Sequence, residues 1–315
     1  MLLLALLLSA APAPAPALPS APLPLQAEAE RAIPAPAAGA LMEVSTGRLL
    51  ALVRPEELVT HAHAPGSLMK LVAAWAALRA DQGARSFECT GKDVHRGKVR
   101  TCWRRDGHGR IGLRQALADS CDIWFYKVAR LLGPRRLLQA AREMGLGSAT
   151  GSDVPGEVAG ALPEPLPELS SPEFAVGRMD GLALTGLQAL SLMGALANGG
   201  TLWSPRLAGP PAQRGKVGTR DELEDLSRAL RDAVQSGTGA AASDLPIAGK
   251  TGTAPVPGQE EPLAWFAGFA PDDAPQVAVV AFVPEGLGAR DAAAAASDLT
   301  RVYFQWRDRG GPSAR

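Results

Sequence analysis

The sequence predicts an α+β fold in which an antiparallel sheet is flanked by helices and carries an inserted all-helical lobe. Strands are expected near both ends of the chain, at residues 40–44, 48–53, 247–253, 263–270 and 277–283. The residues between the two groups show mainly helical periodicity, and a closing helix is expected over 289–307. Strands that bracket a helical middle are typical of one sheet covered by helices.

The first 37 residues are expected to lie outside the folded domain. Residues 2–8 are almost all leucine, and this run is shorter than the roughly 20 apolar residues that span a bilayer. It resembles the apolar core of a secretory signal, although the usual basic residues before it are missing. We therefore expect a signal peptide over 1–28 and an exported, periplasmic or otherwise extracytoplasmic protein. Residues 29–37 are expected to form an Ala/Pro linker without a fold, followed by the folded domain over 38–309.

The other elements follow in order along this domain. Ser45-Thr46-Gly47 separates the first two strands and predicts a β-hairpin, because glycine fits a tight turn. A buried, apolar helix is expected to begin just after Pro65-Gly66. Further helices are predicted over 113–132, 135–144, 182–198 and 223–234, with a proline-rich loop over 151–171.

Composition limits the classes of function. The 315 residues contain 32 Lys+Arg and 32 Asp+Glu, so the formal net charge is zero. A neutral chain has no general attraction for nucleic acid or for an anionic membrane surface, and we expect no nucleic-acid partner. A hydrophobic fraction of 46% is enough for one sizeable core or two small ones.

The stretch Ser67-Leu68-Met69-Lys70 places a serine and a lysine one helical turn apart, so both side chains face the same way. A serine hydroxyl needs a base within hydrogen-bond reach to act as a nucleophile. A lysine can be that base when its amine is neutral, and burial lowers the pKa of a lysine in that direction. Alone, the pattern is weak, because an ordinary solvent-facing helix also produces it.

Two later stretches, Ser120-Cys121-Asp122 and Lys250-Thr251-Gly252, complete a trio in the order found in penicillin-binding proteins and serine β-lactamases. The chain therefore resembles the transpeptidase domain of penicillin-binding proteins, of the elongation type within class B, from about residue 40 to 306. Further matching stretches are Pro65-Gly66-Ser67, Phe125-Tyr126, Ala197-Asn198-Gly199-Gly200-Thr201 and Ala264-Trp265-Phe266-Ala267-Gly268. Fewer than 40 residues precede the first strand, so we expect no pedestal domain before it.

The resemblance implies roles for the residues of the first two stretches. Ser67 would attack a carbonyl and form an acyl-enzyme, and Lys70 would take its proton. Ser120 would relay a proton to the leaving amine. Asp122 would belong to the substrate-binding residues. It stands where asparagine is commoner, and its expected partner is a nearby lysine, since an ionised carboxylate only accepts hydrogen bonds.

The third stretch is implied to bind substrate. Lys250 would supply a fixed positive charge in catalysis, while Thr251 and Thr253 would bind the terminal carboxylate of a D-Ala-D-Ala stem peptide or of penicillin. The backbone N–H groups of Ser67 and Thr253 would form the oxyanion hole, each worth about 3 kcal/mol of barrier. Gly252, on a strand edge, would let the substrate backbone approach closely.

The family implies a peptidoglycan D,D-transpeptidase or carboxypeptidase that needs no catalytic cofactor. Its partners would be peptidoglycan stem peptides, β-lactams and a cell-wall polymerase complex. Two alternatives stay open. A class D-like serine β-lactamase fits the size of the chain, but we find no deacylating glutamate. A non-catalytic penicillin-binding scaffold would not need all three motifs.

The three cysteines cluster in sequence with one histidine: Cys89, Cys102, His108 and Cys121. An exported protein would ordinarily pair its cysteines, and Cys89–Cys102 is the easiest disulfide. A structural Zn²⁺ held by all four residues is the alternative, because four such ligands close a tetrahedron. The loop over 87–109 is charged, rich in glycine and short of core residues, so it needs a covalent or metal cross-link of one kind.

Overall fold

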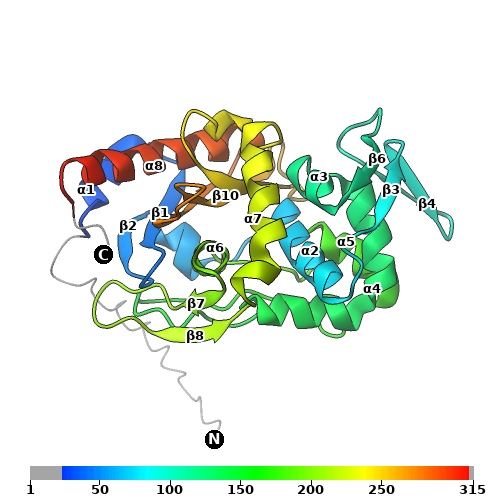
Figure 1. Ribbon diagram of the computed structural model, residues 1–315, viewed down its shortest axis with the longest axis horizontal. Coiled ribbons are helices and arrows are strands. Elements are labelled where there is room, and N and C mark those ends of the chain that lie inside the picture. Colours follow the sequence, from blue (N-terminus) through cyan, green and yellow to red (C-terminus); the bar gives the residue numbers. More distant parts are fainter. Residues whose placement is uncertain (1–22, 312–315) are drawn as a thin grey trace, which may run out of the picture.

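The computed structural model describes residues 23–311 and is built around a five-stranded antiparallel sheet between two layers of helices (Figure 1). The sheet order is β2-β1-β11-β10-β9. Its strands are β1 (Ala38–Glu43), β2 (Leu49–Val53), β9 (Ala248–Ala254), β10 (Leu263–Ala270) and β11 (Val277–Val283). The predicted α+β class and flanked antiparallel sheet are confirmed, and the predicted bounds of β10 and β11 agree with the structure residue for residue.

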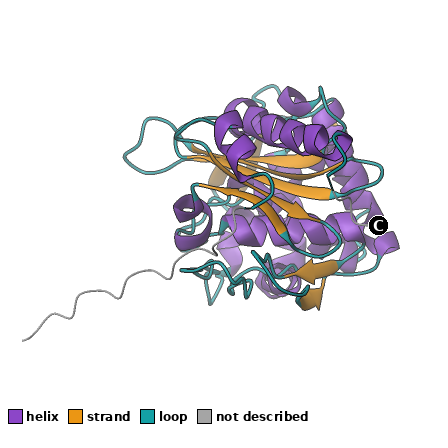
Figure 2. Ribbon diagram, turned by 90° about the vertical axis from the view of Figure 1, so that its left-hand side faces the viewer, coloured by secondary structure: helices purple, strands orange, loops and turns teal. Residues whose placement is uncertain are grey.

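The central strand β11 is apolar along its whole length because both of its faces are buried. Val277, Val279 and Ala281 face the side covered by α8 (Ala293–Asp308). Ala278, Val280 and Phe282 face the larger core, which includes the buried helix α6 (Gly186–Asn198). Figure 2 shows helices on both sides of the twisted sheet.

Helix α1 (Gln26–Ala32) corrects the expectation of an unfolded linker over 29–37. Leu25, Ala29 and Ile33 recur every four residues on one face of α1, are at most 1% exposed, and pack in the α8-side core. The predicted signal peptide lies largely outside the described residues, and its expected end at residue 28 falls inside α1. The Ala/Pro composition of the segment hid this short apolar stripe.

The second part of the molecule is the lobe inserted between β2 and β9. Its helices are α2 (Met69–Arg79), α3 (Leu113–Ala118), α4 (Asp122–Glu143) and α5 (Ser171–Ala175). The lobe is not all-helical, because it also carries two antiparallel ribbons, β3 (Ser86–Cys89) with β6 (Gly109–Gly112) and β4 (Lys92–His95) with β5 (Lys98–Thr101). The β4–β5 hairpin projects from the end of the lobe (Figure 1). These strands are only four residues long, too short for alternation to stand out in the sequence.

The helix expected over 113–132 is broken where the site needs it to be. Helix α3 ends at Ala118 and α4 begins at Asp122, and Ser120 between them has a left-handed φ of +54°. Gly133, with φ +71°, then kinks α4 just before Pro134. The remaining elements are β7 (Thr201–Trp203), β8 (Gln213–Lys216) and α7 (Arg220–Gln235).

We predict that Ile33→Ala lowers the free energy of unfolding by about 2–5 kcal/mol, because it removes a buried side chain that ties α1 to the sheet. Urea unfolding of the full chain measures this. Arg31→Ala, on the exposed side of the same helix, is the matched control and should change stability by no more than about 0.5 kcal/mol. Equal stability of the two variants would show that α1 contributes nothing to the core.

Candidate active site

Ser67 lies on a tight 3-10 turn, Gly66–Leu68, that leads directly into α2. The turn is held from the sheet, since the indole N–H of Trp265 donates to the carbonyl of Ala64 at 3.1 Å. Helix α2 is buried from Met69 to Ala77, which is why its sequence is apolar all round. Lys70 is completely buried in its first turn, while Ser67 keeps part of its surface exposed.

Two glycines allow the serine turn to lie against the edge strand β9. A Cβ atom on Gly66 would lie 2.6 Å from the carbonyl oxygen of Thr253, and one on Gly252 would lie 2.8 Å from that of Pro65. The space in front of Gly252 is therefore taken by the serine turn. The packing of the serine turn thus requires a glycine at position 252, and the expected approach of substrate backbone to Gly252 stays a prediction.

Lys70 makes hydrogen bonds to both Ser120 and Asp122. Its Nζ donates to the carbonyl of Ser120 at 2.7 Å, to Ser120 Oγ at 3.0 Å and to Asp122 Oδ1 at 2.6 Å. An ammonium group has three donors, so this arrangement can satisfy all of them and fits a charged Lys70. Ser120 Oγ can also act as the donor, since a hydroxyl rotates. The same contact thus offers a path for a proton between Ser120 and Lys70.

Asp122 supplies the carboxylate that pairs with Lys70, and its side chain is 1% exposed. Burial by itself raises the pKa of Asp122, but the charges of Lys70 and Arg178 and hydrogen bonds from Lys70 and the Trp103 N–H outweigh it, so the pKa falls below its usual value. The Trp103 N–H donates to Asp122 Oδ2 at 3.1 Å, and Arg178 Nη2 lies 3.6 Å from the same oxygen. Sequence reasoning missed both partners, because neither belongs to a motif.

Lys250 is also completely buried, on β9, and its Nζ donates to the carbonyl of Thr251 at 3.2 Å. Burial lowers the pKa of Lys250 well below its ordinary value, and the charge of Lys70 lowers it further, while Asp122 and Asp119 act in the opposite direction. No carboxylate within residues 23–311 forms an ion pair with Lys250. The two motif lysines therefore differ, since Lys70 is paired and Lys250 is not.

The threonines of β9 are held by residues from two loops. Thr251 Oγ1 donates to Thr238 Oγ1 at 2.8 Å, and the N–H of Gly288 donates to Thr253 Oγ1 at 3.1 Å. Thr238 follows α7 and was missed by sequence reasoning, although Gly237-Thr238-Gly239 marks a loop beside the sheet. Both hydroxyls on β9 are thus oriented toward fixed partners.

The four expected metal ligands meet in space. The ligand atoms of Cys89, Cys102, His108 and Cys121 all lie within 4.8 Å of one another. His108 Nδ1 is 3.5 Å from the sulfur of Cys89 and 3.6 Å from that of Cys102. A tetrahedron with ordinary Zn–S and Zn–N bonds has S···N edges of about 3.6 Å, so the donor set fits Zn²⁺. Within residues 23–311 all three cysteines are free thiols.

The chain matches the family model of the penicillin-binding protein transpeptidase domain over residues 37–301. It is 28% identical to the peptidoglycan D,D-transpeptidase MrdA of Acinetobacter baumannii, over 80% of this chain and 42% of that protein. It is also 28% identical to the stage V sporulation protein D of Bacillus subtilis, over 71% of this chain and 38% of that one. The chain thus spans about two fifths of these relatives.

Solved structures give the same picture. The chain resembles Pseudomonas aeruginosa PBP2 in complex with WCK 5153 with a TM-score of 0.81 and 25% identity, over 92% of this chain and 75% of that one. A structure described as showing coordination of polymerization and crosslinking by a peptidoglycan synthase complex matches with a TM-score of 0.80 and 26% identity, over 89% and 61%.

We predict that Lys250→Met raises the free energy of unfolding at pH 7, because methionine fills similar space without a desolvated charge. The folded-state pKa of Lys250 lies below the unfolded value of about 10.4. The wild-type chain therefore gains stability as the pH rises from the folded pKa toward the unfolded one, and its deficit against Lys250→Met should shrink between pH 7 and pH 10.

Urea unfolding across this pH range measures the difference. Lys216→Met, at an exposed lysine of β8, is the control and should show no pH-dependent difference from the wild type. A Lys250→Met chain that is less stable than the wild type at pH 7 would contradict the assignment of an unpaired, desolvated lysine.

Proposed function

We propose that this chain, which belongs to the penicillin-binding protein transpeptidase domain family, is a peptidoglycan D,D-transpeptidase that works through an acyl-enzyme on Ser67. The family match supports this, and one observation carries it for this chain. Lys70, in the first turn of the helix that follows the serine turn, binds both Ser120 and Asp122, while Gly66 and Gly252 bring that turn against β9. All three motifs thus contribute to one site.

The proposed reaction begins when Ser67 Oγ attacks the carbonyl between the two terminal D-alanines of a stem peptide. Its proton passes to the neutral form of Lys70, whose Nζ contacts Ser120 Oγ. The C–N bond then breaks, and the departing D-alanine amine takes a proton by way of Ser120. An amine of a second stem, or water, attacks the ester and frees Ser67.

The substrate carboxylate would bind at β9. Thr251 and Thr253 present hydroxyls on the same strand as Lys250, and the buried ammonium form of Lys250 favours an anion because it has no carboxylate partner of its own among the described residues. The N–H groups of Ser67 and Thr253 would receive the developing oxyanion. Each such donor is worth about 3 kcal/mol of barrier.

The class D-like β-lactamase alternative is not favoured by the surroundings of Lys70. A mechanism that carboxylates this lysine would place an anionic carbamate where Asp122 Oδ1 lies 2.6 Å from Nζ. Two anions that close in a buried site repel strongly. The scaffold alternative has no supporting observation, and Lys70 is hydrogen-bonded to the side chains of both Ser120 and Asp122.

We also propose that Cys89, Cys102, His108 and Cys121 hold a structural Zn²⁺. Cys121 lies between Ser120 and Asp122, and Cys102 precedes Trp103, whose N–H binds Asp122. A metal held by these residues would fix the turn that presents Ser120 to Lys70. It would take no part in the reaction.

The proposed function also includes export of the catalytic domain and a cell-wall polymerase complex as partner. The substrate class implies a catalytic domain, expected over 38–309, on the outer side of the cytoplasmic membrane. Among residues 23–311, no helix is both long and apolar enough to cross a membrane. The similarity to a structure of a peptidoglycan synthase complex supports a polymerase complex as partner.

We expect labelled penicillin to form a covalent adduct on Ser67 that lasts many minutes, and Ser67→Ala to form none while keeping the wild-type melting temperature. Mass spectrometry of the intact chain detects the adduct. Rapid penicillin turnover without a lasting adduct would instead establish a β-lactamase. A chain that forms no covalent adduct and does not turn penicillin over would leave the non-catalytic scaffold.

We expect about one zinc ion per chain, measured by elemental analysis after purification with Zn²⁺, and a lower melting temperature after chelation. His108→Ala should lose the metal, whereas His95→Ala, at a histidine of the same lobe outside the cluster, should keep it. A zinc-free chain that shows one titratable thiol instead of three would establish the disulfide.

A further inference from the structure

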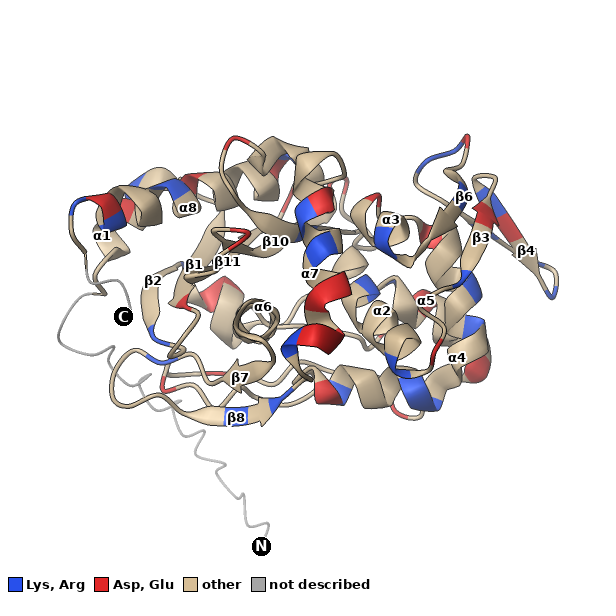
Figure 3. Ribbon diagram, in the orientation of Figure 1, with Lys and Arg blue, Asp and Glu red and all other residues tan. Residues whose placement is uncertain are grey.

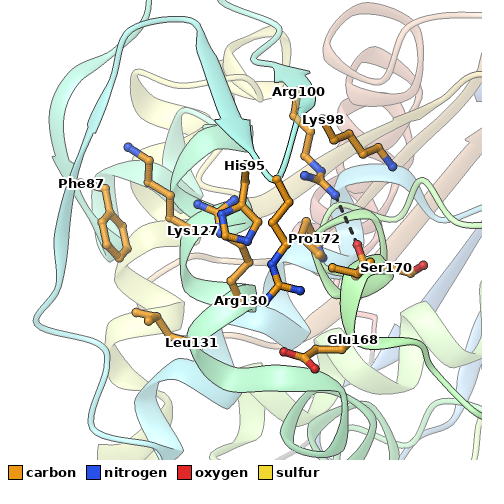
Figure 4. Close-up of a pocket in the computed structure, with 12 residues that line it drawn as sticks. Phe87, His95, Lys98, Arg100, Lys127, Arg130, Leu131, Glu168, Ser170 and Pro172 are labelled. Atoms are coloured by element: carbon orange, nitrogen blue, oxygen red, sulfur yellow. Dashed lines mark hydrogen bonds between the residues drawn. The ribbon is translucent and has the colours of Figure 1, made fainter.

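A cavity of about 790 Å³ opens between the β4–β5 hairpin, α4 and residues 168–172, and none of the catalytic residues lines it. We call it the basic groove, after the six basic side chains that line it: His95, Arg96, Lys98, Arg100, Lys127 and Arg130. Figure 4 shows Phe87 and Leu131 on one side, Glu168 and Ser170 on the other, and His95, Lys127 and Arg130 between them. Figure 3 shows the clustered basic residues on α4 and the hairpin.

The inner face of the hairpin is fixed to the lobe by two ion pairs. Asp93 and Arg100 are cross-strand partners, and each turns inward to a charged residue of a helix. Arg130 Nη1 lies 2.6 Å from Asp93 Oδ2, and Arg100 Nε lies 3.0 Å from Glu173 Oε1. Asp93 and Arg100 are both at most 8% exposed. These two ion pairs hold the hairpin in place as one wall of the groove.

The groove carries an excess of positive charge. Five Lys and Arg side chains line it, against one lining carboxylate, Glu168, and two paired ones just behind, Asp93 and Glu173. Within residues 23–311 the guanidinium of Arg96 forms no ion pair, and Lys127 Nζ donates to the backbone carbonyl of Glu88 at 2.8 Å. Both are available to an anion. Because the whole chain has a formal net charge of zero, this excess of positive charge is a local feature of the groove.

The groove also offers apolar surface and a limited size. Leu131 and Leu169 are 49% and 59% exposed, and both line it. A ligand that matches both features carries carboxylates together with apolar side chains, which describes an acidic peptide better than a phosphodiester polymer. The volume lies in the range of small-ligand pockets, about 300–1,000 Å³, so the groove suits a short peptide and not a folded domain.

The groove is connected to the catalytic residues by a short series of contacts. The guanidinium of Arg100 lies over the Tyr126 ring, 5.9 Å from its centroid. Arg178 donates to the Tyr126 hydroxyl at 3.4 Å and lies 3.6 Å from Asp122, the partner of Lys70. A ligand in the groove would therefore be connected to Asp122 through Arg100, Tyr126 and Arg178.

We propose that the basic groove binds the carboxylates of a peptidoglycan stem peptide that lies beside the reacting one. The inference rests on the proposed function, which supplies the substrate class. Arg96 and Lys127 are the residues assigned to the ligand. Arg100 and Arg130 instead form the ion pairs that hold the β4–β5 hairpin in place.

The test measures binding of a soluble stem peptide ending in D-Ala-D-Ala, in a Ser67→Ala background so that no acylation occurs. Arg96→Gln/Lys127→Gln should raise its Kd at least fivefold. The matched control is Arg110→Gln/Arg135→Gln, two exposed cations of the same lobe outside the groove, and it should bind as the parent does. The same peptide with its side-chain carboxylates amidated should not distinguish the two variants.

Penicillin acylation of Ser67-intact chains separates this inference from the proposed function. Normal acylation together with equal peptide Kd values in the groove and control variants would overturn only the assignment of the groove as a stem-peptide site. Absence of acylation would overturn the proposed function. Groove-dependent binding of poly(glycerol phosphate), or of a glutamate-rich protein segment, that is tighter than binding of the stem peptide would also overturn the assignment to stem carboxylates.

Discussion

The ion pair between Lys70 and Asp122 is the interaction on which the rest of the site depends. Both side chains are at most 1% exposed, and removing two charges from water costs several kcal/mol per ion unless geometry and hydrogen bonds compensate. The surrounding structure supplies them through the Ser120 carbonyl and hydroxyl and the Trp103 N–H. Ser120 has a left-handed backbone conformation, which costs about 1–3 kcal/mol. In this conformation its carbonyl and its hydroxyl both contact Lys70.

The sequence was informative where chemistry or burial constrains many neighbouring residues at once. The continuous apolar runs of β10 and β11 were predicted residue for residue, because both faces are buried. The motif residues on the serine turn, at the α3–α4 break and on β9 were predicted as one site. Helix α1 and the β4–β5 hairpin were missed, because each is short and is held by a few distant contacts. Arg178 and Thr238 were missed because only the folded chain brings them to Asp122 and Thr251.

The two buried lysines show how one site divides stability and chemistry between similar groups. Lys70 is paired, so its charge is compatible with the fold, and it is surrounded by groups that can exchange a proton with it. Lys250 has no such partner and is opposed by burial and by Lys70 itself. Natural proteins retain destabilising arrangements of this kind where function needs them. In the proposed function, an anionic substrate group would be the missing partner of Lys250.

The lobe reaches Asp122 from two directions. On one side, the cysteine–histidine cluster leads through Cys102 to the Trp103 N–H on Oδ2. On the other, the basic groove leads through Arg100 and Tyr126 to Arg178, which approaches the same oxygen. Because Oδ1 is held by Lys70, both directions converge on the carboxylate that pairs with this lysine. The lobe therefore does more than supply Ser120, since Trp103 and Arg178 also lower the pKa of the carboxylate that pairs with Lys70.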